Sequence, residues 1–208
     1  MDFYHDLITQ KSWQVLQDLR RSYDFILIGG WAVFLYTHAL KSKDIDLVCD
    51  FEELEKFKEK FGVVKNDRLQ KYEARQEEVE IDIYVPFYSN PGIPAEDLSR
   101  YAARVEGFGV PSAEILAILK MKALRGRSAS PKGRKDLVDL LSLFKLAEFD
   151  FSKLQSAIAR YNLEELLVLA KKAISQTGSL DELDLNTHKM ARLKRQIFNN
   201  LGEDEAVG

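Results

Sequence analysis

The chain has a single cysteine, Cys49, and only three histidines among its 208 residues. One cysteine cannot build an internal disulfide framework, which favours a reducing compartment. The histidines, His5, His38 and His188, lie far apart in the sequence, so a structural zinc site is not expected. No apolar run approaches the roughly 20 residues that a membrane-spanning helix needs. We therefore expect no membrane partner.

Strong net charge is also lacking, because the formal charge at pH 7 is −3. The chain as a whole is not attracted to nucleic acid, so any such binding must come from a local basic patch. The amino-terminal residues lack the basic and then apolar regions of a signal peptide, which predicts a cytoplasmic protein. An apolar fraction of 46% and a charged fraction of 30% are typical of globular domains.

One stretch near the amino terminus carries most of the chemical signal. The apolar residues 26–28 predict a short buried strand, Gly29–Gly30 a turn, and residues 31–40 a helix. A second strand is expected to carry Asp44 and Asp46. Because side chains alternate along a strand, these two carboxylates should project from the same side.

Two carboxylates held this close repel each other unless a cation lies between them. A glycine turn at the start of a helix can bind phosphate through backbone N–H groups. Gly29–Gly30 equally suits a tight turn without a ligand, and an isolated D-x-D is more often a pair of exposed charges. Lys41 and Lys43, just before Asp44 and Asp46, suit either phosphate contact or a soluble loop.

A third acid in a later strand favours the metal interpretation over exposed charges. Residues 79–85, VEIDIYV, form the clearest strand pattern, with Glu80, Asp82 and Tyr84 on one face. Asp82 is the best candidate for the third ligand, and Glu80 is the second choice. Carboxylate oxygens are the ligands that Mg²⁺ prefers, so the pattern indicates chemistry on phosphates.

The remaining pattern predicts an α+β protein, with a mixed sheet flanked by helices up to residue 110 and a helical region over residues 111–208. Residues 87–99 and 126–134 are expected to be irregular connections, and the last eight residues to be frayed. Further strands are expected at 63–64, 69–74 and 100–110. Helices are expected over residues 3–20, 51–61, 112–124, 135–146, 151–161, 163–175 and 187–201.

The order of these motifs resembles the DNA polymerase β-type nucleotidyltransferase superfamily. The resemblance rests on G-G-W-A, about ten residues of helix, a basic pair, D-I-D-L and a later I-D-I-Y. The G-G-x-A variant is similar to that of antibiotic nucleotidyltransferases and of AbiEii-like toxin nucleotidyltransferases. The segments VPSAEILAILKMKALRGR and GRKDLVDLLSL favour the AbiEii-like group, and the resemblance covers about residues 24–143.

This resemblance implies a nucleotidyltransferase catalytic domain over residues 1–110 and a helical domain over 111–208 that completes the nucleotide and acceptor cleft. Its metal would be Mg²⁺ or Mn²⁺, with an NTP as substrate. It implies that Asp44, Asp46 and Asp82 are catalytic metal ligands and that Gly29, Gly30, Lys43, Lys120 and Asp136 bind the nucleotide. The serine that often follows the first glycine is absent, and Gly30 stands in its place.

Residues 120–135 contain seven lysines and arginines and no acid. Lys120 lies in a helix that is otherwise apolar almost all round, so an anion or an acidic partner is expected. The functional interpretation is that Lys120 meets the triphosphate while the arginines meet a polyanionic acceptor such as tRNA. The alternative is that Lys120 extends to solvent and the remaining residues form a soluble linker.

Two classes of function follow. The first is a Mg²⁺-dependent enzyme that transfers NMP from an NTP to an acceptor hydroxyl. An RNA acceptor is preferred, and the resemblance suggests a toxin with a cognate antitoxin; a small molecule of the antibiotic type is the alternative acceptor. The second is a non-catalytic module that binds nucleotide or RNA and regulates a partner.

Overall fold

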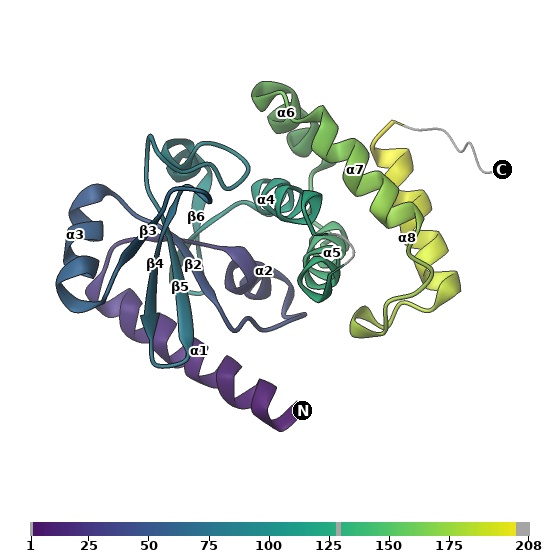
Figure 1. Ribbon diagram of the computed structural model, residues 1–208. Helices are drawn as coiled ribbons and strands as arrows, with labels where there is room; N and C mark the ends of the chain where they lie inside the picture. The colour runs from purple at the N-terminus through teal and green to yellow at the C-terminus, as the bar shows by residue number, and fades with distance from the viewer. Residues whose placement is uncertain (1, 128–129, 203–208) are drawn as a thin grey trace. The chain divides into compact units, whose positions relative to one another are not determined.

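The computed structural model describes residues 2–127 and 130–202, and the surroundings of side chains from Leu7 onward. The described chain forms two compact units that meet in sequence between Ser112 and Ala113. The first unit contains a mixed sheet and its helices, and the second is helical (Figure 1). The α+β fold class expected from the sequence is therefore confirmed.

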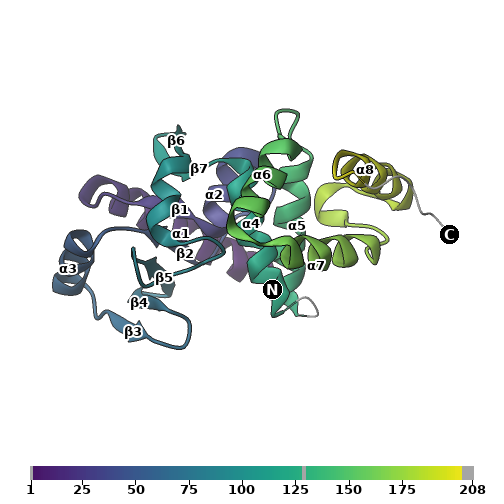
Figure 2. The same ribbon diagram turned by 90° about the horizontal axis from the view of Figure 1, so that it is seen from above.

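Seven strands form one sheet in the order β3-β4-β5-β2-β1-β7-β6. Figure 2 shows this order from one edge, β3, to the other, β6. The β2–β5 and β1–β7 pairs are parallel, and the other four pairs are antiparallel. The strands are β1 (Ile26–Ile28), β2 (Ile45–Val48), β3 (Val64–Asn66), β4 (Lys71–Gln76), β5 (Val79–Tyr84), β6 (Ala102–Val105) and β7 (Phe108–Pro111).

Alternation along the central strands gives the sheet one apolar face and one polar face. In β5, Ile81 and Ile83 are fully buried, whereas Glu80 is exposed and Asp82 is half-buried. Burial of the apolar side chains against the helices stabilises this orientation, because a shift by one residue would reverse every side chain. The polar face thus keeps its carboxylates accessible.

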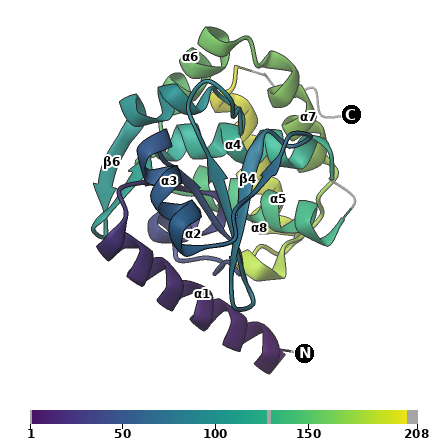
Figure 3. The same ribbon diagram turned by 60° about the vertical axis from the view of Figure 1, so that its left-hand side comes forward.

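The helices of the first unit are α1 (Asp2–Ser22), α2 (Gly29–Thr37) and α3 (Phe51–Lys60), together with a 3₁₀ helix over Ala95–Tyr101. Helix α1, the longest of these, is seen along its length in Figure 3. Its buried Ser12 accepts a hydrogen bond of 2.8 Å from the Trp31 indole N–H of α2. The contact fixes α2 and therefore the glycine turn with which it begins.

The structure corrects two details of the sequence prediction in this unit. Helix α2 covers Gly29–Thr37 rather than 31–40, because His38 is left-handed with φ 51°. The single strand expected over residues 100–110 is instead the β6–β7 hairpin, because Glu106 and Gly107 both have positive φ, at 48° and 85°. That pair of angles makes the tight turn that joins antiparallel strands.

The second unit consists of α4 (Ala113–Arg125), α5 (Pro131–Phe144), α6 (Phe151–Tyr161), α7 (Glu164–Ser175), a 3₁₀ helix over Asp181–Leu183, and α8 (Thr187–Asn200). Helix α4 is buried over most of its surface, in agreement with its apolar sequence. Helix α5 begins within the connection expected at 126–134, because Ser130 caps it and Pro131 occupies its first position. Residues 128–129 of that connection and 203–208 of the tail lie outside the described residues.

Across residues 2–127 and 130–202, no helix has both the length and the apolar character required to cross a bilayer.

Candidate functional site

Asp46 and Asp82 lie side by side on the two central parallel strands. Residues 45–48 of β2 pair in register with residues 81–84 of β5, which places Asp46 opposite Asp82. Neighbouring strands are about 4.8 Å apart, so two side chains on the same face at the same register are adjacent. The sequence prediction that these acids come together is met by the geometry, although their role as metal ligands stays a prediction.

Gly29 lies against the Asp46 carboxylate. Asp46 also pairs in register with Ile28 of β1, directly before Gly29. Gly29 has φ +69°, and a Cβ at this position would overlap Asp46 Oδ2 and lie 2.6 Å from Asp46 Cγ. Only glycine combines this backbone angle with this close approach. The N-cap residue Ile28 makes no side-chain cap, and the amino terminus of α2 therefore begins next to the Asp46 carboxylate with its backbone N–H groups uncapped by Ile28.

A lysine that the sequence analysis did not single out binds the second carboxylate. Lys71 Nζ lies 2.5 Å from Asp82 Oδ2 and 3.0 Å from Glu73 Oε1. The Lys71 side chain is only 11% exposed. Burial opposes its charge, but the hydrogen bonds and the attraction of Asp82 and Glu73 outweigh burial and raise the pKa of the ammonium. Lys71 therefore stays positively charged beside the acid pair.

The pKa of Asp82 is raised from 3.8 to about 6. Burial is the largest cause, because it disfavours the charged carboxylate, and the nearby negative charge of Asp46 is the second. Lys71 acts in the opposite direction without cancelling these effects. The acid pair is thus a place where an additional positive charge would be stabilised.

The other predicted site residues of this unit lie around the pair. Asp44 is half-buried and directly precedes β2 rather than lying within it, and Lys43 is half-buried beside it. Glu80, the second-choice ligand, is exposed. Among the residues that the structure describes, no three His, Cys, Asp or Glu side chains are grouped so that they could hold a metal ion. The three-carboxylate ligand set remains a prediction, with Lys71 contacting the carboxylate of Asp82.

Replacing Gly29 by alanine should destabilise the protein and displace the Asp46 carboxylate. The left-handed backbone alone costs an alanine about 1–2 kcal/mol, and the added Cβ overlaps Asp46. Urea unfolding of the variant measures the loss. Gly62→Ala is the matched control, because a Cβ there meets nothing within 4 Å. Equal stability of the two variants would contradict the close approach of Gly29 and Asp46.

Asp82 should make stability depend on pH in the absence of divalent cations. Between about pH 4 and pH 6 the folded chain keeps a proton that the unfolded chain has released, because the folded pKa is about 6 instead of 3.8. Stability should therefore fall as pH rises through this window, by at most about 3 kcal/mol. Urea unfolding at each pH, compared with Asp82→Asn, isolates this contribution. Parallel pH profiles for the two proteins would disprove it.

In the second unit, Lys120 lies in a buried ionic cluster. Its ammonium is 2.6 Å from Asp139 Oδ2 and 3.2 Å from Asp136 Oδ1. Arg127 binds the other oxygen of Asp136, with Nη2 at 2.6 Å and Nε at 2.8 Å. The acidic partner expected for Lys120 is therefore present. The alternative that Lys120 extends to solvent is wrong, since its side chain is only 8% exposed.

Asp136 and Asp139 are buried, with side chains 4% and 0% exposed. They occupy one face of α5, three residues apart, and turn toward α4. Two positive and two negative groups balance each other in this cluster. Contact of Lys120 and Asp136 with a nucleotide, which the family resemblance implies, stays a prediction.

Comparisons with known proteins find no match among family models or curated sequences. A provisionally assigned nucleotidyltransferase from H. pylori has a similar structure, with 16% identity, 96% of this chain and 98% of that chain covered, and a TM-score of 0.49. An antigenic nucleotidyltransferase-like protein from Paracoccidioides brasiliensis is 20% identical, with 80% of this chain and 93% of that chain covered and a TM-score of 0.40. The Megavirus polyadenylate synthase is 11% identical, with 66% of this chain and 31% of that chain covered and a TM-score of 0.44. At such identities and scores, the site geometry alone carries the functional argument.

Proposed function

We propose that the chain is a Mg²⁺-dependent nucleotidyltransferase that transfers NMP from an NTP to an acceptor hydroxyl. The observation that carries the proposal is the in-register pair of Asp46 and Asp82 beside the amino terminus of α2. A carboxylate pair and the backbone N–H donors of a helix amino terminus are the two elements that chemistry on a triphosphate needs. Gly29 brings these elements into contact.

The donors of this pair fit a divalent cation. Asp46 and Asp82 supply the hard oxygen ligands that Mg²⁺ and Mn²⁺ prefer. The Asp82 carboxylate already binds one cation in the structure, the Lys71 ammonium, at 2.5 Å. When bound, the metal would neutralise charge on the phosphates and activate the attacking oxygen. Asp44, next to β2, would complete the ligand set.

The remaining roles, which are phosphate binding and proton transfer, fall to residues of the chain itself. The first turn of α2, with Gly29 and Gly30, binds the triphosphate through backbone N–H groups, and the positive end of the helix dipole favours its charge. Lys43 contacts a phosphate from the segment before β2. One of the carboxylates accepts the proton of the acceptor hydroxyl, whose oxygen attacks the α-phosphorus. The bond to the bridging oxygen breaks, and pyrophosphate leaves.

The acceptor we favour is RNA. Within the basic segment 120–135, Lys120, Arg125, Arg127 and Arg134 form ion pairs with acids of the chain. The exposed Lys122 and Lys132 are the lysines of this segment that support the choice. An RNA acceptor and a cognate antitoxin also agree with the AbiEii-like resemblance of the sequence. An antibiotic-type small molecule is the alternative acceptor. A non-catalytic regulatory module is disfavoured because Asp44, Asp46 and Asp82 are all present.

Incubation with each α-labelled NTP, Mg²⁺ and total tRNA tests the proposal. Label from one or more NTPs should appear in RNA with wild-type protein and be absent with Asp46→Asn. Parallel reactions with γ-labelled NTPs should leave the acceptor unlabelled, since the γ-phosphate departs in pyrophosphate.

The same assay separates the acceptors and the reaction classes. Transfer of α-label to an aminoglycoside but not to RNA would support the small-molecule branch. Transfer of γ-label instead of α-label would replace nucleotidyl transfer by phosphoryl transfer. Absence of transfer to any acceptor, together with absence of metal-dependent nucleotide binding, would contradict the enzyme proposal.

A further inference from the structure

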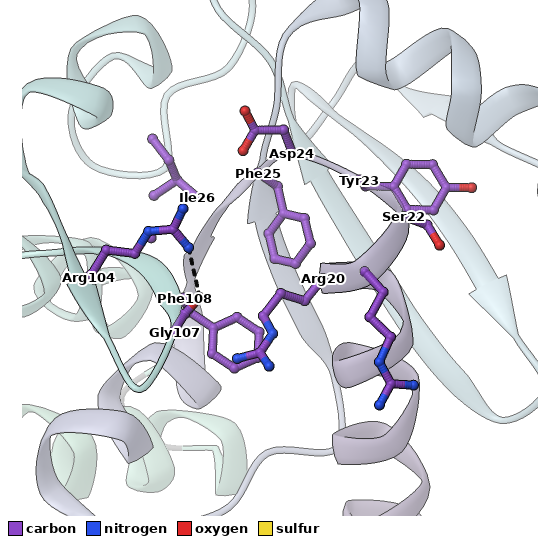
Figure 4. Close-up of a pocket in the computed structure, with 11 residues that line it drawn as sticks. Arg20, Ser22, Tyr23, Asp24, Phe25, Ile26, Arg104, Gly107 and Phe108 are labelled. Atoms are coloured by element: carbon purple, nitrogen blue, oxygen red, sulfur yellow. Dashed lines mark hydrogen bonds between the residues drawn. The ribbon is translucent and has the colours of Figure 1, made fainter.

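A second polar depression lies in the first unit, at the other end of β1 from Gly29. It is formed where α1 ends, where β1 begins and where the β6–β7 hairpin turns (Figure 4). Its volume is about 360 Å³, which falls at the lower end of the range for small-ligand pockets. Arg20, Arg21, Arg104 and Asp24 supply its charged side chains.

Two of these arginines are held in place by neutral groups of the hairpin. Arg20 donates a hydrogen bond of 3.1 Å to the backbone oxygen of Glu106. Its guanidinium carbon lies 4.7 Å from the centre of the Phe108 ring. Arg104 donates a hydrogen bond of 3.0 Å to the backbone oxygen of Gly107, drawn as a dashed line in Figure 4. Both guanidinium groups are therefore fixed around the same turn.

Neither of these positive charges is compensated by an ion pair. In the described part of the chain, no carboxylate forms a salt bridge with Arg20 or Arg104, whereas Arg21 is paired with Asp18 at 2.9 Å. Asp24 points away from the Arg20 guanidinium in Figure 4. Each guanidinium has five N–H donors, so one backbone carbonyl leaves most of them available to a ligand.

We propose that this depression, the hairpin pocket, binds a phosphate group. Fixed guanidinium groups match the oxygen geometry of phosphate and form strong charge-assisted hydrogen bonds with it. The half-buried Phe25 in the lining offers apolar surface to the rest of such a ligand, whereas Phe108 is buried beneath the Arg20 guanidinium. Arg20 lies in the last turn of α1, where a basic side chain often interacts with the helix's own carbonyl groups. Here Arg20 instead donates to a backbone oxygen of the hairpin, so its guanidinium is directed toward the pocket.

The hairpin pocket is separate from the site of Asp46 and does not depend on the proposed activity. Ile26 lines the pocket, and Gly29 follows the end of the same strand. Three residues of extended strand cover about 10 Å. A phosphate in the hairpin pocket would therefore lie at the opposite end of β1 from a triphosphate at α2.

Amide NMR titration without divalent cations tests the pocket, with inorganic phosphate and decauridylic acid as separate probes. The Gly107 and Gly109 amides should shift with saturation. Arg104→Ala and Arg20→Lys should each weaken binding by about tenfold, the equivalent of one charge-assisted hydrogen bond. Arg75→Ala is the matched control, because Arg75 is also exposed and also donates to a backbone carbonyl, that of Glu77, at 2.9 Å. It should leave binding unchanged.

The two probes separate the sources of the phosphate. Tighter binding of the oligonucleotide at the same amides would identify a nucleic-acid backbone, and binding of inorganic phosphate alone would identify a small phosphorylated molecule. The Arg104 side chain is exposed and its hydrogen bond is to one backbone oxygen of the turn, so the Arg104→Ala variant should fold. The amide spectrum of this variant, recorded without ligand, verifies the fold. The absence of saturable shifts with both probes would overturn the proposal, as would binding that survives in the Arg20→Lys/Arg104→Ala double variant.

Discussion

Asp46→Asn should lower the rate of label transfer by on the order of 10³-fold. Asparagine keeps the size of the side chain but removes its charge, so a cation at the acid pair would lose one of two adjacent ionic ligands. A loss of about 4 kcal/mol of transition-state stabilisation corresponds to that factor. Single-turnover transfer from an α-labelled NTP measures it.

The same substitution should produce an effect that does not depend on turnover. The Asp46 charge is the second cause of the raised pKa of Asp82. Its removal should therefore bring the Asp82 pKa down from about 6 toward its ordinary range, which carboxyl NMR detects. Glu80→Gln is the matched control, since Glu80 is an exposed acid on β5, the strand that carries Asp82. If Asp46→Asn and Glu80→Gln lower the transfer rate equally and shift the Asp82 pKa equally, a specific role for Asp46 is contradicted.

Lys120→Met should destabilise the helical unit by about 3–5 kcal/mol, the usual result of removing one partner from a buried ion pair. Methionine fills a similar volume, but Asp139 is fully buried and would lose its cation at 2.6 Å. Its Oδ1 atom has no hydrogen-bond partner within the described residues, so no second contact is in place to compensate for the loss. Far-UV circular dichroism during urea unfolding measures the effect.

Two further variants distinguish charge imbalance from a packing defect. Lys122→Met changes an exposed lysine on the same helix and should alter stability by less than about 0.5 kcal/mol. Adding Asp139→Asn to Lys120→Met restores neutrality around Asp136 and Arg127 and should recover part of the lost stability. If the double variant is no more stable than Lys120→Met, the cluster is not stabilised by its charge balance.

Local sequence patterns were sufficient to predict many elements. Residues 26–28, 51–61 and 151–161 were expected as one strand and two helices, and the structure confirms them with β1, α3 and α6. These segments combine clear apolar spacing with strong caps, such as the 2.8 Å bond from the Glu53 N–H to Asp50 Oδ1. The β6–β7 hairpin was missed, although the sequence Glu106–Gly107 carries the glycine that such turns require.

The contacts of the candidate site depend on register, which the sequence does not reveal. Asp46 and Asp82 could be grouped from their alternation, but Lys71 meets Asp82 only because β4 pairs with β5 so that Glu73 lies opposite Asp82. The ion pair of Lys120 and Asp139 likewise requires the packing of α4 against α5. The apolar surroundings of Lys120 in the sequence predict an anionic partner, but they do not indicate which acid it is.

Calorimetric titration with Mg²⁺ or Mn²⁺ tests the central claim that Asp46 and Asp82 form a divalent-cation site. Wild-type protein should bind with saturation, and Asp46→Asn should weaken binding at least tenfold. Lys71→Met should tighten binding, because it removes an ammonium that occupies Asp82. Lys65→Met is the control, since Lys65 pairs with exposed Asp67 at 2.7 Å. Unchanged affinity in Asp46→Asn, or weaker binding in Lys71→Met, would contradict the account.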